Sequence, residues 1–333
     1  MNIRQKFLFE NFLEFSTKEL VILRHSDGKD WIKNLPPDQK EILNNTHLYF
    51  ICKKPRFNFI PDTLFFDKNT LQIGFELSSK DNTRKQIDIL HNYSYYFNGA
   101  IGFELHKTDK SKITVYYHHN SSRTIPIEHI FPLFDCMPYN DFSQFSDHNI
   151  IDYEILYIGQ SVGRKRKSNA VTRTSKGHHK LPTIVKYTSE YEPHYEIFII
   201  LATIQAPYNI AFSGGQFFDS KYTKNNSLQE LKHLGKSHSM KKIVDLMEAC
   251  LIKYFDTKYN KKLKGKPILG TELFIKEYKE NYDLNTALTV IDTRKLPYVN
   301  LCSPIRKSNN VHKIYNTIHK ENDRLTIGDI IKI

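Results

Sequence analysis

The chain has 333 residues, of which 40% are hydrophobic and 25% are charged. This length exceeds one ordinary core and predicts more than one domain, and the composition is typical of a soluble globular protein. The chain has no run of about 18 uninterrupted apolar residues, so no membrane span is expected. Residues 1–15 lack the apolar block of a signal peptide, and the four cysteines are widely spaced, which argues against a zinc site or a disulfide framework. A reducing cytoplasm is therefore the expected location.

The net charge of +12 is carried by the second half of the chain. Residues 1–150 contain 18 Lys and Arg and 18 Asp and Glu, whereas residues 151–333 contain 30 basic and 18 acidic residues. From Gln160 to Ser189 there is no acidic residue at all. This stretch is either a solvated loop or a face that binds phosphates in a salt-dependent way, and the second reading is favoured. The candidates for nucleic-acid contacts are Gln160, Arg164, Arg166, Lys167, Lys176, His179 and Lys180.

Residues 1–125 are predicted to form a mixed α/β domain. Short strands rich in β-branched and aromatic residues are expected at Leu48–Cys52, Thr63–Phe66 and Lys112–Tyr117. The sequence Ile73-Gly-Phe-Glu-Leu77 recurs identically at Ile101–Leu105. Two copies are too few for a solenoid, so two similar strands joined by a helix over Arg84–Phe97 are predicted.

Residues 126–268 are predicted to form a second domain that begins with a connector over residues 126–150. A strand is expected at Asp152–Ile158, ending at Gly159, and a strand buried on both faces at Glu196–Ile204. Apolar residues at helical spacing predict a helix over Met240–Phe255. Residues 269–333 are expected to be a C-terminal extension that contains strands at Leu288–Asp292 and Tyr298–Leu301 and packs on the second domain.

Glu248 lies on the apolar stripe of that helix, where a carboxylate is costly to bury without a cation or donors. It is either an edge residue paired with Lys241 or Lys253, or a ligand of a hard divalent cation. Asn260 follows shortly after the helix, where an asparagine commonly ends a helix or makes a turn.

The order of three motifs resembles that of the GIY-YIG nucleases, a superfamily that includes homing endonucleases, restriction enzymes and a repair nuclease. Tyr157-Ile-Gly-Gln-Ser161 is similar to the family's second block, and the segment from Glu248 to Asn260 is similar to its closing block. Arg173, His178 and Leu181 resemble the element between them. The resemblance covers about residues 150–266. The nearest candidate for the family's first block is Met137-Pro-Tyr139, and the second family tyrosine is unassigned.

The resemblance implies a small antiparallel sheet flanked by helices that hydrolyses phosphodiester bonds of double-stranded DNA. One Mg²⁺ or Mn²⁺ ion, bound by Glu248, would polarise the scissile phosphate, and Arg173 would neutralise charge on its oxygens. Tyr157 would orient or deprotonate the attacking water, or else it is only a packing residue of the sheet. His178 would relay a proton or hold a phosphate, Asn260 would support the site, and Gly159 would allow a close approach of the backbone.

The expected activity is that of a DNA endonuclease, with restriction or anti-phage defence as a biological role. Residues 1–125 would then supply sequence specificity, regulation, a homodimer contact or a contact with a partner in a defence complex. The alternative is a DNA-binding module that retains the nuclease fold without catalysis.

Overall fold

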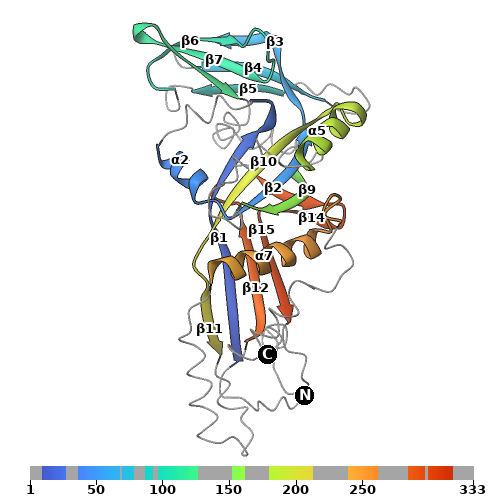
Figure 1. Cartoon of the computed structure of the whole chain (residues 1–333). Helices are drawn as coiled ribbons and strands as arrows, with labels where there is room; N and C mark the ends of the chain where they lie inside the picture. The colour runs from blue at the N-terminus through green and yellow to red at the C-terminus, as the bar shows by residue number, and fades with distance from the viewer. Residues whose placement is uncertain are drawn as a thin grey trace, which may run out of the picture.

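The computed structural model describes residues 10–27, 37–67, 70–78, 87–92, 97–126, 152–161, 180–212, 239–261, 284–296 and 299–317. Within these stretches the protein is mixed α/β and dominated by β-sheet (Figure 1), as predicted at the level of fold class. In chain order the elements are β1 Glu10–Arg24, η1 His25–Asp27, α2 Pro37–Asn44, β2 Leu48–Pro55, β3 Phe57–Phe66, β4 Thr70–Leu77, β5 Ile87–Asn92, β6 Ala100–Leu105, β7 Lys112–Tyr117, η3 His118–Asn120, β8 Ser121–Pro126, β9 Asp152–Gln160, α5 Lys180–Tyr191, β10 Tyr195–Ile204, β11 Tyr208–Phe212, α7 Met240–Phe255, β12 Leu284–Asp292, β13 Asn300–Ser303, β14 Arg306–Asn309 and β15 Val311–Thr317.

The main sheet of the described residues has nine strands in the order β14-β13-β9-β2-β10-β1-β12-β15, with β11 paired to β1. The strand β2 lies between β9 and β10 and is antiparallel to both. Both β1 and β2 belong to residues 1–125, the segment predicted as a separate N-terminal domain. The predicted boundary at residue 125 therefore runs through one hydrogen-bonded sheet.

The central strands of this sheet are apolar at nearly every position, so both of its faces must be covered, and both are. Alternate residues of β2 and β10 divide between two buried clusters. One cluster lies against α7 and includes Phe50 and Ile200. The other lies against α2 and α5 and includes Ile51 and Leu201. This double burial explains why β10 reads as a continuous hydrophobic run, as predicted for Glu196–Ile204.

Most elements predicted from hydrophobic periodicity are confirmed. The helix predicted at Met240–Phe255 is α7 with the same bounds, and it ends at Asp256, which adopts the left-handed conformation (φ 46°). The strand predicted at Asp152–Ile158 is β9, which continues to Gln160. Pro182 lies in the first turn of α5, where its missing N–H breaks no helical hydrogen bond.

The helix predicted over Arg84–Phe97 is wrong where the structure describes it, because β5 at Ile87–Asn92 is a strand. Its backbone pairs with β4 from Thr70 to Phe75, and both Ile87 and Ile89 are β-branched residues that favour strands. The two repeat copies lie in β4 and β6, in separate three-stranded sheets with orders β3-β4-β5 and β6-β7-β8. The prediction of two similar strands is therefore confirmed.

Charged side chains connect the β6-β7-β8 sheet to the main sheet. Arg24 at the end of β1 is buried, and its guanidinium contacts Glu196 of β10 at 2.5 Å and Asp109 at 3.7 Å. Asp109 also contacts Lys112 of β7 at 3.1 Å, and Lys112 in turn contacts Asp27 at 2.5 Å. This chain of opposite charges fixes the position of the small sheet at one end of β1.

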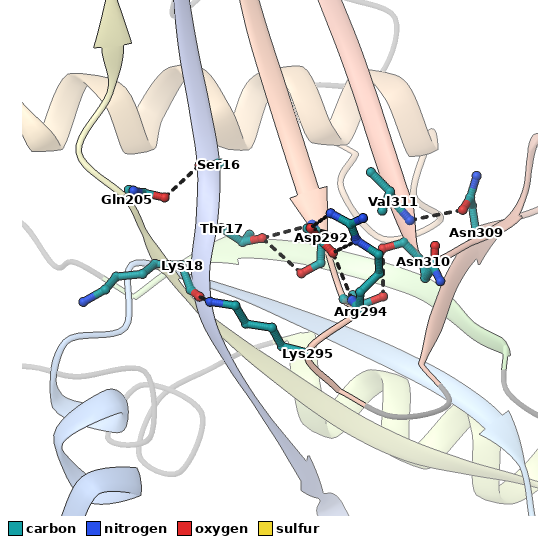
Figure 2. Close-up of polar contacts among 11 residues, drawn as sticks. Ser16, Thr17, Lys18, Gln205, Asp292, Arg294, Lys295, Asn309, Asn310 and Val311 are labelled. Atoms are coloured by element: carbon teal, nitrogen blue, oxygen red, sulfur yellow. Dashed lines mark hydrogen bonds and ion pairs between the residues drawn. The ribbon is translucent and has the colours of Figure 1, made fainter. Parts of the chain in front are cut away.

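A second polar cluster marks the point at which β1 changes its pairing partner (Figure 2). β1 pairs with β11 over Glu10–Glu14 and with β12 over Asn11–Ser16, and from Thr17 onward it is antiparallel to β10, with a register shift between Thr17 and Leu20. The hydroxyl of Thr17 accepts a hydrogen bond from the backbone N–H of Asp292 at 3.1 Å, and Arg294 holds the Asp292 carboxylate through its Nε atom at 2.9 Å. The end of β12 is therefore fixed to the irregular position of β1.

Candidate functional site

Five of the predicted site residues that the structure describes lie on β9 or are hydrogen-bonded to it. Tyr157, Gly159 and Gln160 are on β9, Glu248 is on α7, and Asn260 follows α7. Lys180 is the first residue of α5. The predicted residues that lie outside the described stretches are Arg164, Arg166, Lys167, Arg173, Lys176, His178 and His179.

Asn260 binds the backbone of Ile158 through both ends of its amide. Its Oδ1 atom accepts the Ile158 N–H at 2.9 Å, and its Nδ2 atom donates to the Ile158 carbonyl at 2.8 Å. The hydroxyl of Thr257 donates to the same Oδ1 atom at 2.6 Å. Asn260 is buried, so its role extends beyond the local turn that its position alone suggested. Its amide forms the pair of hydrogen bonds that the backbone of a neighbouring strand would otherwise make with Ile158.

The free edge of β9 is completed by this same loop. The strand β13 pairs only with residues 152–154 of β9. Further along, a bulge leaves Leu156 without a partner in the register between β2 and β9, and its carbonyl accepts the backbone N–H of Tyr259 at 3.1 Å. The segment after α7 therefore crosses the edge of β9 and links the α7 face of the sheet to the α5 face.

On the α7 face, one side-chain amide holds two carboxylates. The Nε2 atom of Gln160 donates to Asp245 Oδ1 at 2.6 Å and to Glu248 Oε2 at 2.7 Å. Asp245 and Glu248 are three residues apart on α7, so they lie on the same face of the helix. This contact brings the predicted catalytic carboxylate to the residue that follows Gly159. It also engages both amide hydrogens of Gln160, which was predicted to contact nucleic acid.

Carboxylate and amide oxygens are the donors that hard divalent cations prefer. Asp245, Glu248 and Gln160 therefore have the donor chemistry for an ion of the Mg²⁺ type. The residues described here contain no group of three or more His, Cys, Asp or Glu side chains positioned to hold a metal.

On the α5 face, two tyrosines lie over Gly159. Tyr49 of β2 is directly opposite Gly159 in the register, and its ring centroid is 6.0 Å from that of Tyr157. A Cβ atom on Gly159 would lie within 3.0 Å of the Tyr49 ring and hydroxyl and 2.8 Å from Tyr157 Cε1. Glycine is therefore required by the close approach of the tyrosines rather than by the backbone conformation.

Tyr49 is the site residue that sequence reasoning missed. The companion of Tyr157 was sought at Met137-Pro-Tyr139, which lies outside the described residues. The available signal was Tyr49 itself, within the strand predicted at Leu48–Cys52. It could not be connected to Tyr157 from sequence, because the pairing of β2 with β9 joins residues that are far apart in the chain.

The loop before β2 closes the end of β9. The backbone N–H of Ser161 donates to the His47 carbonyl at 2.8 Å, and the Ser161 hydroxyl donates to the Thr46 carbonyl. The Nδ1 atom of His47 accepts the Ile204 N–H at 3.0 Å, so its proton resides on Nε2. Burial lowers the pKa of His47, which keeps this imidazole neutral and structural.

The tyrosines and the carboxylates occupy opposite faces of β9. Tyr157 packs with the cluster next to α5, whereas Gln160 reaches Asp245 and Glu248 on α7. Gly159 lies between Ile158 and Gln160, and Gln160 is the last residue of β9. The structure therefore places Tyr157 and Glu248 near the same end of β9 but on opposite faces of the sheet.

No family model, curated protein or solved structure matches the chain, so its function must be argued from its own residues and their geometry. None of the helices that the structure describes is both long enough and apolar enough to cross a membrane.

Proposed function

We propose that this protein is a metal-dependent endonuclease of the GIY-YIG type that hydrolyses phosphodiester bonds in DNA. The observation that carries the proposal is the meeting of motifs that are distant in sequence. Asn260 is hydrogen-bonded to Ile158 within Tyr157-Ile-Gly159, and Glu248 is hydrogen-bonded to the next residue, Gln160. A family resemblance based on chance tripeptides would not require these blocks to touch.

The sheet arrangement supports the same proposal. The resemblance implies a small antiparallel sheet flanked by helices. The strands β9, β2 and β10 are consecutive neighbours and antiparallel, and they lie between the cluster next to α5 and the cluster next to α7. In this reading β2 contributes the first family strand, and Tyr49 is the second family tyrosine. Residues 56–151 are then an insertion between the first two strands.

In the proposed mechanism the phosphate lies across the end of β9. A bound divalent ion of the Mg²⁺ type would supply charge stabilisation for the leaving oxygen. Glu248 is oriented by the Gln160 amide to bind that ion, with Asp245 beside it. Tyr157 and Tyr49 orient the attacking water, and Arg173 and His178 contact the phosphoryl oxygens as the resemblance implies. Asn260 holds the strand that carries Tyr157 in place.

The test is incubation of the protein with supercoiled plasmid DNA in Mg²⁺ or Mn²⁺, with nicking followed on gels. Glu248→Gln should lower the nicking rate by about 100-fold or more while it retains the fold, because it removes one charge and little volume. Asp62→Asn on β3 removes an exposed carboxylate elsewhere and should cut as the wild type does.

Two results contradict the proposal in different ways. Wild-type protein that binds DNA but never nicks it would identify the chain as a DNA-binding module without catalysis. Equal nicking by the wild type and by Glu248→Gln would retain the activity but remove Glu248 from the site.

A further inference from the structure

A row of aromatic and cationic side chains leads outward from the candidate site over the end of α5. The rings of Tyr187 and Tyr191 are stacked with their centroids 4.9 Å apart and their planes inclined by 33°. The Nζ atom of Lys258 lies 4.0 Å from the centroid of Tyr187 and 5.6 Å from that of Tyr259. This spacing places the lysine charge against aromatic faces.

The row is continuous with the tyrosine pair of the candidate site. Tyr259 packs on the same buried cluster as Tyr157 and Val185 of α5. The backbone of Tyr259 is hydrogen-bonded to Leu156, the residue next to Tyr157. A ligand that extends along β9 on the α5 face from Tyr157 therefore meets Tyr259 beside Leu156, and then Lys258 and the α5 tyrosines.

The outer part of the row is open to solvent. Tyr191 is 67% exposed and Tyr187 is 36% exposed, although both carry large apolar rings. Burial cannot explain why two stacked tyrosines lie on this surface. Exposed aromatic faces beside a cation are the usual composition of a surface that stacks nucleobases.

The charge around the row favours a polyanion. The two nearby carboxylates of this end of α5 each have a lysine partner: Glu190 lies 3.7 Å from Lys186, and Glu192 lies 2.9 Å from Lys53. The contacts described for Lys258 are with aromatic rings. Its charge is therefore available on the ring surface for a phosphate.

We propose that Tyr187, Tyr191 and Lys258 bind an unpaired segment of a nucleic-acid strand, with bases stacked on the tyrosines and a phosphate on Lys258. Bases inside a duplex have both faces covered, so this surface selects an unpaired strand. The proposal rests in part on the proposed nuclease function and narrows it: the substrate is DNA with a single-stranded segment next to the cleaved bond.

The experiment measures fluorescence anisotropy of three labelled DNAs in EDTA, so that no cutting occurs. The probes are a single-stranded oligothymidine, a blunt duplex, and the same duplex with a single-stranded overhang. Tyr191→Leu should weaken binding of the single strand and of the overhang by about 5-fold to 100-fold, the range for one stacked base. Binding of the blunt duplex should change by less than about 2-fold.

Matched variants distinguish stacking from general damage. Tyr191→Phe retains the ring and should bind all three DNAs as the wild type does. Tyr315→Leu removes a tyrosine that is 45% exposed on β15, far from α5 in sequence, and should also have no effect. Lys258→Met should weaken the single strand and reduce the salt dependence of its binding.

Unchanged affinity of Tyr191→Leu and Lys258→Met for the two single-stranded probes would overturn the proposal. Self-association of the wild type that is lost in Tyr191→Leu would instead assign the surface to a contact between two copies. Because these measurements contain no divalent ion, their outcome is independent of whether the protein cuts plasmid DNA.

Discussion

The end of β9 and the two three-stranded sheets between β2 and β9 are built in opposite ways. Around β9, buried hydrogen bonds join residues from distant parts of the chain, as Asn260 does with Ile158. In the small sheets each strand pairs with the next along the chain, and the β6-β7-β8 sheet is connected to the main sheet through charged side chains such as Arg24 and Asp109. Figure 1 shows these sheets stacked at one end of the molecule.

The two regions differ in how precisely their contacts fix the positions of the side chains that make them. A buried hydrogen-bonded contact tolerates little displacement, because any unpaired buried group is costly. The ion pairs of Asp109, whose side chain is 29% exposed, are worth less and can adapt their geometry. Substitutions around β9 are therefore expected to destabilise the protein strongly, whereas equivalent substitutions in the small sheets are expected to have weak effects.

The largest effect is expected for Asn260→Ala. This change leaves the backbone N–H and carbonyl of Ile158 without partners in a buried position, so it should lower the free energy of unfolding by about 2–4 kcal/mol. Urea unfolding measures this loss. Asn309→Ala removes an exposed asparagine that accepts the Val311 N–H and should cost less than about 1 kcal/mol. Equal costs for the two variants would contradict the expected difference between a buried and an exposed hydrogen bond.

An intermediate effect is expected for Gly159→Ala. The added methyl group meets the rings of Tyr49 and Tyr157, so overpacking should cost about 1–3 kcal/mol. Gly102→Ala in β6 is the matched control, because the nearest atoms to its added methyl group lie 3.8 Å away, in ordinary contact. Thermal unfolding should show a lower Tm for the first variant only. Tyr49→Leu should partly relieve the penalty in a double-mutant cycle.

The smallest effect is expected at Asp109, and it should depend on pH. Partial burial opposes ionisation, but hydrogen bonds from Ser111 and the charges of Arg24 and Lys112 outweigh it and lower the pKa of Asp109 to about 2. A depressed pKa stabilises the fold above the ordinary value of 3.8, and this contribution is lost as the pH falls towards 2.

Asp109→Asn should therefore be less stable than the wild type at pH 7, by less than about 1 kcal/mol because the group is partly exposed. The difference should disappear at about pH 2, which urea unfolding across this pH range would reveal. Asp62→Asn, an exposed carboxyl of β3, is the control. A difference that grows as the pH falls would mean that the charges around Asp109 do not stabilise the fold.

The sequence predicted those parts of the molecule whose signals are local. The periodicity of α7 and the apolar run of β10 determine their own secondary structure, so both predictions were confirmed. The identity of a strand's neighbour is not a local property. For this reason Tyr49 could not be assigned to Tyr157, and the strand β5 was mistaken for a helix that its pairing with β4 prevents.

The same limit applies to side-chain roles. Gln160 was grouped with the basic stretch and predicted to contact nucleic acid, but its amide is directed to Asp245 and Glu248 across the packing of α7 on β9. Glu248 and Asn260 were chosen because their segment resembles the closing block of the GIY-YIG family. Both residues are hydrogen-bonded to β9, where the resemblance expects them to lie. Their catalytic roles stay predictions.

The position of β2 between β9 and β10 has a consequence for synthesis of the protein. Every strand that pairs with β2 in the described sheet lies after residue 151, so β2 leaves the ribosome long before its partners. About 100 residues separate it from the end of β9, a delay of roughly 5–20 s at typical translation rates. Throughout that interval an apolar strand with two open edges is available to other chains. Chains truncated after residue 150 are accordingly expected to aggregate, as light scattering would show, and a nascent chain of this length is a natural client for chaperones.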